Sequence, residues 1–331
     1  MKKKFSLKEL MFSYGETPAL VIGVLAFLFF SLFTKKFFSP YNMGLVFNQM
    51  AIYGMLGTAL TLVIIVGGMD ISIGSTLSLC CAVEAMLWMH GKDLPNQTMW
   101  ILLGCLGSVV VGTLVGMLLG TMITFFKIPD MVASLALQRV TRGIAIMVSG
   151  GATLSRFPKD IYKVGISKFL GLGLPFWGCL VFTIVFTIIL AYTRFGRRIY
   201  MLGNNRVAAS LAGIDVAKTR LKVYTVEGFA VGLTSIVYLA YNFTYNATSC
   251  GASILTYVLA SALMGGASMD GGKGTAVGTF FGAFVLGTLM NGLIHFGVSA
   301  EAVDILIALL IMLVLLTQFL RARASHKEAK A

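Results

Sequence analysis

The chain has 331 residues, of which 57% are hydrophobic and only 12% are charged, and its formal net charge is +13. In a soluble domain of this size, about a quarter of all residues are charged, and these cover its surface. The composition therefore excludes a soluble enzyme, a disordered chain and a nucleic-acid-binding domain. Most Lys and Arg residues lie in short gaps between apolar stretches, as expected of cytoplasmic loops in a membrane protein.

About ten apolar segments approach the roughly 20 residues that a membrane-spanning helix needs. We predict an all-α polytopic membrane protein with a single transmembrane domain over residues 1–331. The first segment begins late after Lys2, Lys3 and Lys4, so we interpret it as a retained helix and not as a cleavable signal peptide. In chain order, the segments cover residues 17–34, 44–66, 71–90, 98–126, 130–149, 174–193, 224–246, 254–268, 274–297 and 302–320.

The distribution of basic residues predicts the orientation of these segments. With ten spans both termini lie on one side, and placing them in the cytoplasm puts most Lys and Arg residues inside. The loop at 150–173 runs against this bias, so we expect it to hold amphipathic structure of its own. Recurrent glycines in the spans, such as Gly112, Gly116 and Gly120, predict close helix packing.

Residues 194–222 interrupt the pattern between the sixth and seventh spans, because the segment is basic and too polar to cross a membrane. Asn205 is suited to cap a helix at its N-terminus, and Gly213 is suited to end it. We interpret the segment as containing a short helix that lies across the cytoplasmic face of the membrane. The alternative is an ordinary basic loop that fixes the topology.

Charged residues inside the apolar segments are the first candidates for function, because they are costly in lipid. Asp70 lies in a polar break with Gly67, Gly68 and Ser72, where it either caps the next helix or shapes a pathway or gate. We expect the charges of Glu84, Arg139 and Arg142 to be buried, with Glu84 paired to one of the two arginines. Glu301 and Asp304 begin the last span, where the helix dipole favours acids.

No residue pattern indicates an enzyme or a metal site. The glycine-rich run at 265–274 lacks the phosphate-loop signature, since Gly274 stands where Ser or Thr must follow Lys273. The histidines are far apart in the sequence, and the five cysteines lack metal or redox spacing. We therefore expect this chain to contain no catalytic residues, no metal and no cofactor.

Three stretches together resemble the permease subunits of the ribose, xylose and galactoside group of ATP-binding-cassette (ABC) sugar importers. They are VGGMDISIGSTLSL (66–79), TRFGRRIYMLGNNRVAASLAGIDV (193–216) and ALMGGASMDGGKGTAVGTFFGAFVLGTLMNGL (262–293). The first is similar to the family's Gly-Gly-x-Asp-Leu-Ser-x-Gly signature, and the third is similar to its Gly-Gly-x-Ser-x-x-Gly-Gly-x-Gly-Thr run. The resemblance implies a type II-like importer bundle in the inner membrane of a bacterium.

The resemblance also implies partners and roles for residues. A second permease copy or a homologous permease would complete the pathway, an extracytoplasmic binding protein would deliver a monosaccharide, and a two-domain ABC ATPase would bind and hydrolyse ATP-Mg. The implied contacts to the ATPase are Gly203, Asn205, Arg206, Ala208, Ala209 and Gly213. The implied pathway or gate residues are Gly67, Gly68, Asp70, Ser72, Gly74, Gly265, Gly266 and Ser268.

The sequence departs from the family at two places, one of which is Asn204-Asn205-Arg206-Val207 in place of the commoner Gly-Asn-x-x. At the other, acids are common in the family at the positions of Leu255 and Tyr257, and both are absent here. This leaves the substrate open, with a nucleoside or another small polar solute as alternatives to a sugar, and it fits one half of a heteromeric permease pair. The competing class is an ion-coupled secondary transporter that uses Asp70 and Glu84 as ion or proton sites. That class does not explain the basic segment 194–222, because such a transporter has no ATPase to bind.

Overall fold

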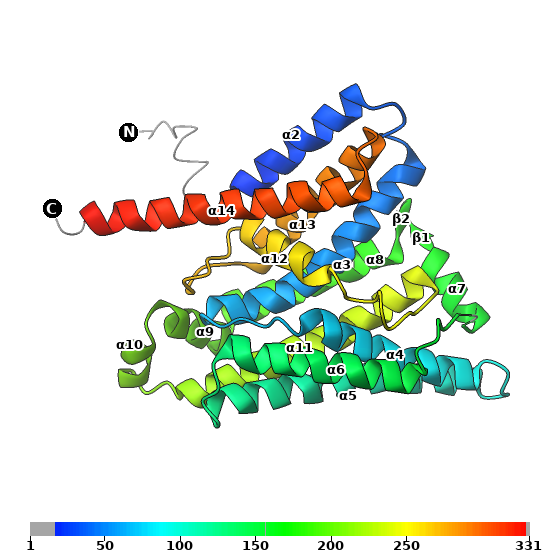
Figure 1. Ribbon diagram of the computed structural model, residues 1–331, viewed down its shortest axis with the longest axis horizontal. Coiled ribbons are helices and arrows are strands. Elements are labelled where there is room, and N and C mark those ends of the chain that lie inside the picture. The colour runs from blue at the N-terminus through cyan, green and yellow to red at the C-terminus, as the bar shows by residue number, and fades with distance from the viewer. Residues whose placement is uncertain (1–16, 156, 329–331) are drawn as a thin grey trace.

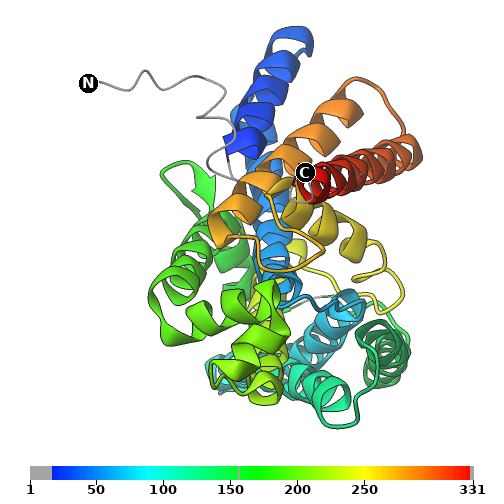
Figure 2. The same cartoon turned by 90° about the vertical axis from the view of Figure 1, so that its left-hand side faces the viewer.

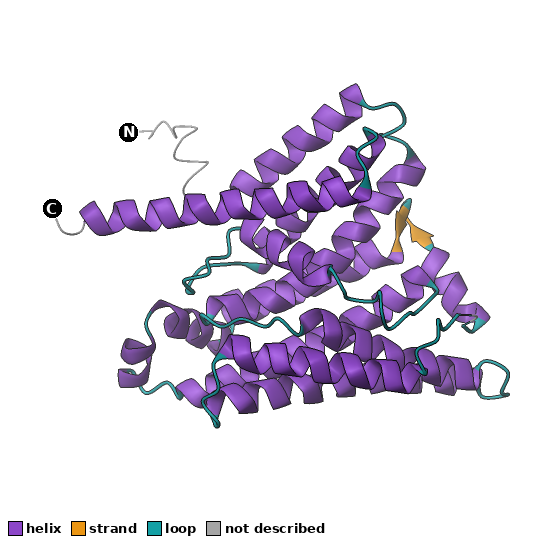
Figure 3. Ribbon diagram, viewed as in Figure 1, coloured by secondary structure: helices purple, strands orange, loops and turns teal. Residues whose placement is uncertain are grey.

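The computed structural model describes residues 17–155 and 157–328, which form a bundle of long helices with one short β-hairpin (Figures 1 and 3). Lys2, Lys3 and Lys4, on which part of the orientation argument rests, lie outside these residues. The helices are α2 (Thr17–Phe33), α3 (Pro40–Ile65), α4 (Ile73–Gly91), α5 (Gln97–Thr124), α6 (Asp130–Ser149), α7 (Lys159–Ile166), α8 (Leu174–Tyr192), α9 (Arg194–Asn204), α10 (Arg206–Leu211), α11 (Val216–Asn242), α12 (Ile254–Met264), α13 (Ala276–His295) and α14 (Ala300–Glu328).

Each of the ten apolar segments coincides with a helix, so the helical polytopic fold is confirmed. Within the described part of the chain, seven helices are long and apolar enough to cross a membrane, namely α3, α4, α5, α6, α8, α11 and α13. Residues 20–33 and α12 are apolar but shorter. Several boundaries differ from the prediction by four or more residues, at α3, α11, α12 and α14. The helix α11 begins at Val216 because Asp215 caps it, and α12 ends at Met264 because Gly265 and Gly266 follow.

The helix α3 holds two groups of helices together (Figures 1 and 2). On one side α2, α12 and α14 pack around α13, and on the other side α4, α5, α6 and α11 pack together. The apolar side chains of α3, such as Leu56, Leu60 and Leu62, are fully buried between these groups. The cores of both groups therefore depend on one central helix.

The predicted glycine stripes do bring helices together. A Cβ atom at Gly112 of α5 would overlap the carbonyl oxygen of Gly228 of α11, and one at Gly228 would overlap the carbonyl oxygen of Gly112. The helices α5 and α11 thus touch backbone to backbone, which is how small residues support helix association in lipid.

The two ends of the bundle differ in structure. The helices α9 and α10 lie at the left-hand end in Figure 1, toward which α14 also runs, and Figure 2 views the bundle from that end. At the right-hand end lie α7 and the hairpin of β1 (Lys168–Phe169) and β2 (Leu172–Gly173). The expected ordered structure within 150–173 is therefore present.

Candidate functional site

The three sequence stretches meet at one point, at the end of the bundle that carries α9 and α10. Arg206 donates a hydrogen bond from Nη2 to the carbonyl oxygen of Gly67, at 2.9 Å. The backbone N–H of Gly272 donates to the carbonyl oxygen of Ile65 at 2.8 Å, and the Tyr200 hydroxyl donates to the carbonyl oxygen of Gly274 at 2.7 Å. We call this meeting point the junction.

Glycine is required at the junction because backbones touch there. A Cβ atom at Gly203 would overlap the carbonyl oxygen of Ile65 and would lie 2.6 Å from the backbone nitrogen of Gly272. Gly67 adopts a φ of +69°, in the left-handed region that favours glycine. The polar break after α3, the segment 203–206 and the glycine-rich loop 265–275 are thus assembled as one unit.

The helix α10 begins as expected, since the Asn205 side chain accepts hydrogen bonds from the backbone N–H groups of Val207 at 2.9 Å and Ala208 at 3.0 Å. It ends at Leu211, and Gly213 follows with a φ of +79°. The segment therefore holds a capped helix, preceded by α9, and is not an irregular loop.

The residues that the resemblance implied as contacts to the ATPase differ in exposure. Ala209 is only 2% exposed and packs against the chain's own core, and Gly203 and Arg206 face the junction. The rest of the implied set is exposed, namely Asn205, Ala208 and Gly213. The most exposed apolar side chains of α10 are Val207, 70% exposed, and Leu211, 85% exposed. These two apolar side chains lie one helical turn apart, so they form one exposed strip.

An ion pair supports the junction from the neighbouring helices. The Nη2 atom of Arg220 on α11 lies 2.7 and 2.6 Å from the two carboxylate oxygens of Asp130, the first residue of α6, and the Tyr224 hydroxyl donates to Asp130 Oδ2 at 2.8 Å. A Cβ atom at Gly68 would lie 2.5 Å from that hydroxyl and 3.0 Å from Oδ2. Gly67 and Gly68 are thus held from two sides. A cavity of about 370 Å³, lined in part by Lys127, Asp130 and Arg220, lies beside the pair.

The remaining predicted gate residues fall into separate local roles. Asp70 is buried, and its Oδ1 accepts hydrogen bonds from both the backbone N–H and the hydroxyl of Ser72 at 2.6 Å. Gly74, at the start of α4, packs against Gly251 in the loop before α12 and makes no contact with the residues of the junction named above.

In the glycine-rich loop, Gly265 packs against Gly278 at the start of α13, and Gly266 follows it into the turn. The backbone N–H of Ser268 donates to the carbonyl oxygen of Lys273 at 3.2 Å. These residues shape the loop that carries Gly272 to the junction.

The predicted pairing of Glu84 with Arg139 or Arg142 is wrong. Glu84 is fully buried, but it accepts hydrogen bonds from the Ser235 hydroxyl at 3.2 Å and from the Cys105 thiol at 3.9 Å. The expected burial of Arg139 is also wrong, because this residue is exposed. Half-buried Arg142 donates from Nη1 to the carbonyl oxygens of Ala247 and Cys250 at 2.5 and 2.6 Å. Spacing placed the two arginines on one helix face correctly, but it did not reveal the backbone acceptors that Arg142 finds 105 residues away.

Sequence reasoning missed Glu227 on α11. Its side chain is buried, its Oε1 atom has no hydrogen-bond partner among the described residues, and Asp70 is its charged neighbour. An acid within an apolar segment is the same signal that identified Glu84, so Glu227 was detectable from the sequence.

Outside the spans, the Asp215 carboxylate accepts a hydrogen bond from the Lys218 backbone N–H at 2.9 Å. This bond, followed by the Lys218 side chain, holds the pKa of Asp215 below its usual value. Asp215 therefore stays ionised as the N-cap of α11, directly after the exposed strip.

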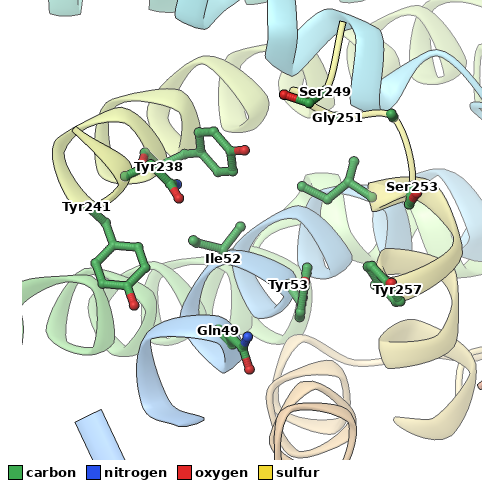
Figure 4. A pocket seen from close by; sticks show the side chains of 12 residues that line it. Gln49, Ile52, Tyr53, Tyr238, Tyr241, Ser249, Gly251, Ser253 and Tyr257 are labelled. Atoms are coloured by element: carbon green, nitrogen blue, oxygen red, sulfur yellow. The ribbon is translucent and has the colours of Figure 1, made fainter. Parts of the chain in front are cut away.

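A pocket of about 410 Å³ lies near the opposite end of the bundle, between α3, α11, α12 and the loop 243–253 (Figure 4). Four tyrosines line it, two from α11 and one each from α3 and α12: Tyr53, Tyr238, Tyr241 and Tyr257. The other polar groups on its wall come from Gln49, Asn242, Ser249 and Ser253. Sequence analysis did not identify this pocket, because its members are scattered over 200 residues and none is charged.

Tyr257 replaces one of the acids that the family usually carries, yet a carboxylate is present beside it. The Tyr257 hydroxyl donates a hydrogen bond to Asp304 in the first turns of α14. The sequence suggested only that Asp304 interacts favourably with the dipole of the last helix. The structure shows that Asp304 also accepts a hydrogen bond from Tyr257.

Comparisons with known proteins identify a family and several relatives of the chain. The family model described as "Branched-chain amino acid transport system / permease component" matches residues 42–315. The chain is 31% identical to the ribose import permease protein RbsC of Bacillus subtilis (strain 168) over 289 residues, 85% of this chain and 87% of that protein. It is 29% identical to RbsC of Escherichia coli (strain K12), over 89% of this chain and 93% of that protein. It is 28% identical to the autoinducer 2 import system permease protein LsrC of Salmonella typhi, over 91% of this chain and 84% of that protein.

Proposed function

The chain belongs to the family of permease components that this model describes, and we propose that it is the membrane-spanning subunit of an ABC importer for a sugar. The relatives named above are import permeases for ribose and autoinducer 2. Its apolar helices and its family make it a multi-pass protein of the inner membrane. The resemblance identified from three short motifs thus extends over most of the chain.

The observation that carries the proposal is the construction of α10. Its strip of Val207 and Leu211 is exposed, while Arg206, directly before the strip, is bonded to Gly67 at the junction. Apolar side chains that are 70% and 85% exposed at a polar end of a membrane protein favour a protein partner. A two-domain ABC ATPase fits this position. It binds ATP-Mg and hydrolyses it, so that this chain supplies the pathway and no catalytic residue.

The junction gives such a partner a route to the spans. When the ATPase domains close, they displace α10, and α9 and α11 move with it because both are joined to it by short connections. The hydrogen bond from Arg206 to Gly67 transmits this movement to the break after α3. The hydrogen bond from Gly272 to Ile65 transmits it to the glycine-rich loop. The loop 265–275 and the break after α3 are irregular segments that contact α10 or α9, so they are able to change shape when α10 moves.

The remaining parts of the importer follow from the same proposal. A second permease, either a copy of this chain or a homologue, completes the pathway, and a binding protein delivers the sugar to the end that carries the pocket. Both termini and residues 194–222 then lie in the cytoplasm.

Reconstitution tests this proposal. The chain is placed in proteoliposomes with its candidate ATPase, second permease and binding protein, and uptake of labelled ribose, xylose, galactose, a nucleoside and leucine is measured. We expect ATP-dependent uptake of one of the sugars and none when the ATPase carries an inactivated Walker A lysine. Uptake that follows a proton or sodium gradient without ATP would identify a secondary transporter. ATP-dependent uptake of the nucleoside or of leucine alone would refute the sugar assignment.

A further inference from the structure

We propose that the pocket between α3, α11 and α12 is a sugar-binding site of the permease itself, built for a single neutral ring. The inference rests on the proposed function, since it supposes that a sugar passes through this chain. At about 410 Å³ the pocket lies near the lower end of the range of small-ligand sites, which suits one sugar ring.

The functional groups on the pocket wall select for a neutral polyol. Tyrosine hydroxyls, two amides and two serine hydroxyls offer both donors and acceptors, and none of the described residues that line the pocket is charged. The carboxylate and ammonium groups of an amino acid would lose water here without gaining an ionic partner, which is costly. Sugar hydroxyls exchange hydrogen bonds with water for bonds of the same kind. The pocket thus favours a sugar over the branched-chain amino acid in the family's description.

The rings of Tyr53 and Tyr257 form a fixed corner of the pocket. Their centroids lie 5.2 Å apart with an angle of 49° between the ring planes. Because the Tyr257 hydroxyl already donates its one hydrogen bond to Asp304, its oxygen can accept a hydrogen bond from a sugar hydroxyl. Asp304 therefore acts as a positioning residue, which sets the direction of the Tyr257 hydroxyl.

The opposite wall of the pocket is preformed. The loop 243–253, which supplies Ser249 and Ser253, is fastened to α6 by the two bonds from Arg142 to the carbonyl oxygens of Ala247 and Cys250. A backbone bridge between Leu154 and Tyr245, with both hydrogen bonds at 2.8 Å, ties the start of the loop to the segment after α6. A wall that is rigid before binding lowers the cost of ordering on binding.

One group on the pocket wall retains unused hydrogen-bonding capacity. Gln49 contributes its amide to the wall from α3, and its Oε1 atom is buried without a hydrogen-bond partner among the described residues. Since a buried polar atom is normally paired, an unpaired amide at a pocket wall is consistent with a partner that arrives from outside.

The test measures binding to the permease complex in nanodiscs without the binding protein. The probe is whichever of labelled ribose, xylose and galactose the reconstituted importer takes up, with unlabelled leucine as competitor. We expect saturable binding of that sugar that leucine does not displace. Tyr257→Phe removes the accepting hydroxyl and weakens binding about two- to tenfold. Asp304→Ala weakens binding less, and Asp304→Asn, which still accepts the bond from Tyr257, restores it.

The control variant is Tyr192→Phe, which alters an exposed tyrosine at the far end of α8 and leaves binding unchanged. Two results overturn the inference while the proposed function stands: the importer takes up a sugar that shows no saturable binding to the permease, or Tyr257→Phe binds it as the native chain does. Displacement of the sugar by leucine refutes the selectivity argument. If the importer takes up none of the three sugars, the proposed function fails, and this inference fails with it.

Discussion

Arg206 and Gly67 are joined by a hydrogen bond of 2.9 Å, although 139 positions separate them in the chain. The bond links the first residue of α10 to Gly67, which lies in the polar break after α3 and has a left-handed backbone. Removing the guanidinium separates two properties of the segment: its contact with a partner and its connection to the spans.

Arg206→Met keeps the aliphatic stem and removes the bond to Gly67. We expect the ATPase to co-purify with this variant, because Val207 and Leu211 are unchanged, while ATP-driven sugar uptake falls several-fold. The bond is exposed, so its loss costs only about 0.5–1 kcal/mol in stability. The matched control is Lys218→Met, which removes an exposed cation of the same region. Uptake by Arg206→Met at the native rate would show that this bond plays no part in coupling.

The pair of Asp130 and Arg220 should matter for stability more than a surface ion pair does. The two side chains are only 20% and 11% exposed, so Asp130→Asn leaves a largely buried guanidinium without its counter-charge. We expect the variant to lose about 1–3 kcal/mol of unfolding free energy, observed as a lower melting temperature in detergent.

Asp215→Asn is the control for that experiment. It neutralises the exposed partner of Lys218, and asparagine caps a helix as well as aspartate does, so the melting temperature should stay the same. Equal shifts for the two variants would mean that burial of the Asp130 pair contributes nothing.

Glu84→Gln distinguishes an importer powered by ATP from an ion-coupled transporter. Since Glu84 accepts bonds from neutral groups of Ser235 and Cys105, a glutamine in its place keeps an acceptor and the shape of the side chain. We expect normal assembly and at least half of the native uptake in proteoliposomes. Loss of uptake with assembly intact, together with loss of a dependence on the proton gradient, would favour the ion-coupled class.

The orientation of the chain is testable at two exposed positions. In a background from which Cys80, Cys81, Cys105, Cys179 and Cys250 have been replaced, an impermeant thiol reagent should label Ser249→Cys in intact cells. It should label Leu211→Cys only after the membrane is permeabilised. The reverse pattern would invert the topology and would place α10 on the wrong side for an ATPase.

The sequence was sufficient to predict where the helices lie along the chain, but it was not sufficient to predict which residues of different helices touch. Hydropathy located ten helices because each must be apolar over most of its length, and the capping side chain of Asn205 located the start of α10. The pocket could not be found in this way, because tyrosines and amides at positions such as Gln49 and Tyr257 meet only through the packing of α3 on α12. The error at Glu84 has the same origin, since proximity in the membrane was inferred from charge alone.

The choice of residues on α10 shows what three-dimensional information adds. The resemblance implied Ala209 as a contact to the ATPase, but Ala209 is buried, and a bulky residue there would collide with the chain's own core. A substitution at Ala209 would therefore report on folding. Only the exposed strip of Val207 and Leu211 isolates the contact with a partner.

The most direct test of the account is co-purification of the ATPase with Leu211→Glu. Leu211 is 85% exposed, so the charge leaves the fold intact, and it places an unpaired carboxylate in an apolar contact. Leu170→Glu, at a 77% exposed leucine near the opposite end of the bundle, is the control. We predict that Leu211→Glu inserts normally but loses the ATPase and all ATP-driven uptake, while Leu170→Glu retains both. If Leu211→Glu retains the ATPase and transports at the native rate, α10 is not the coupling element and the account is wrong.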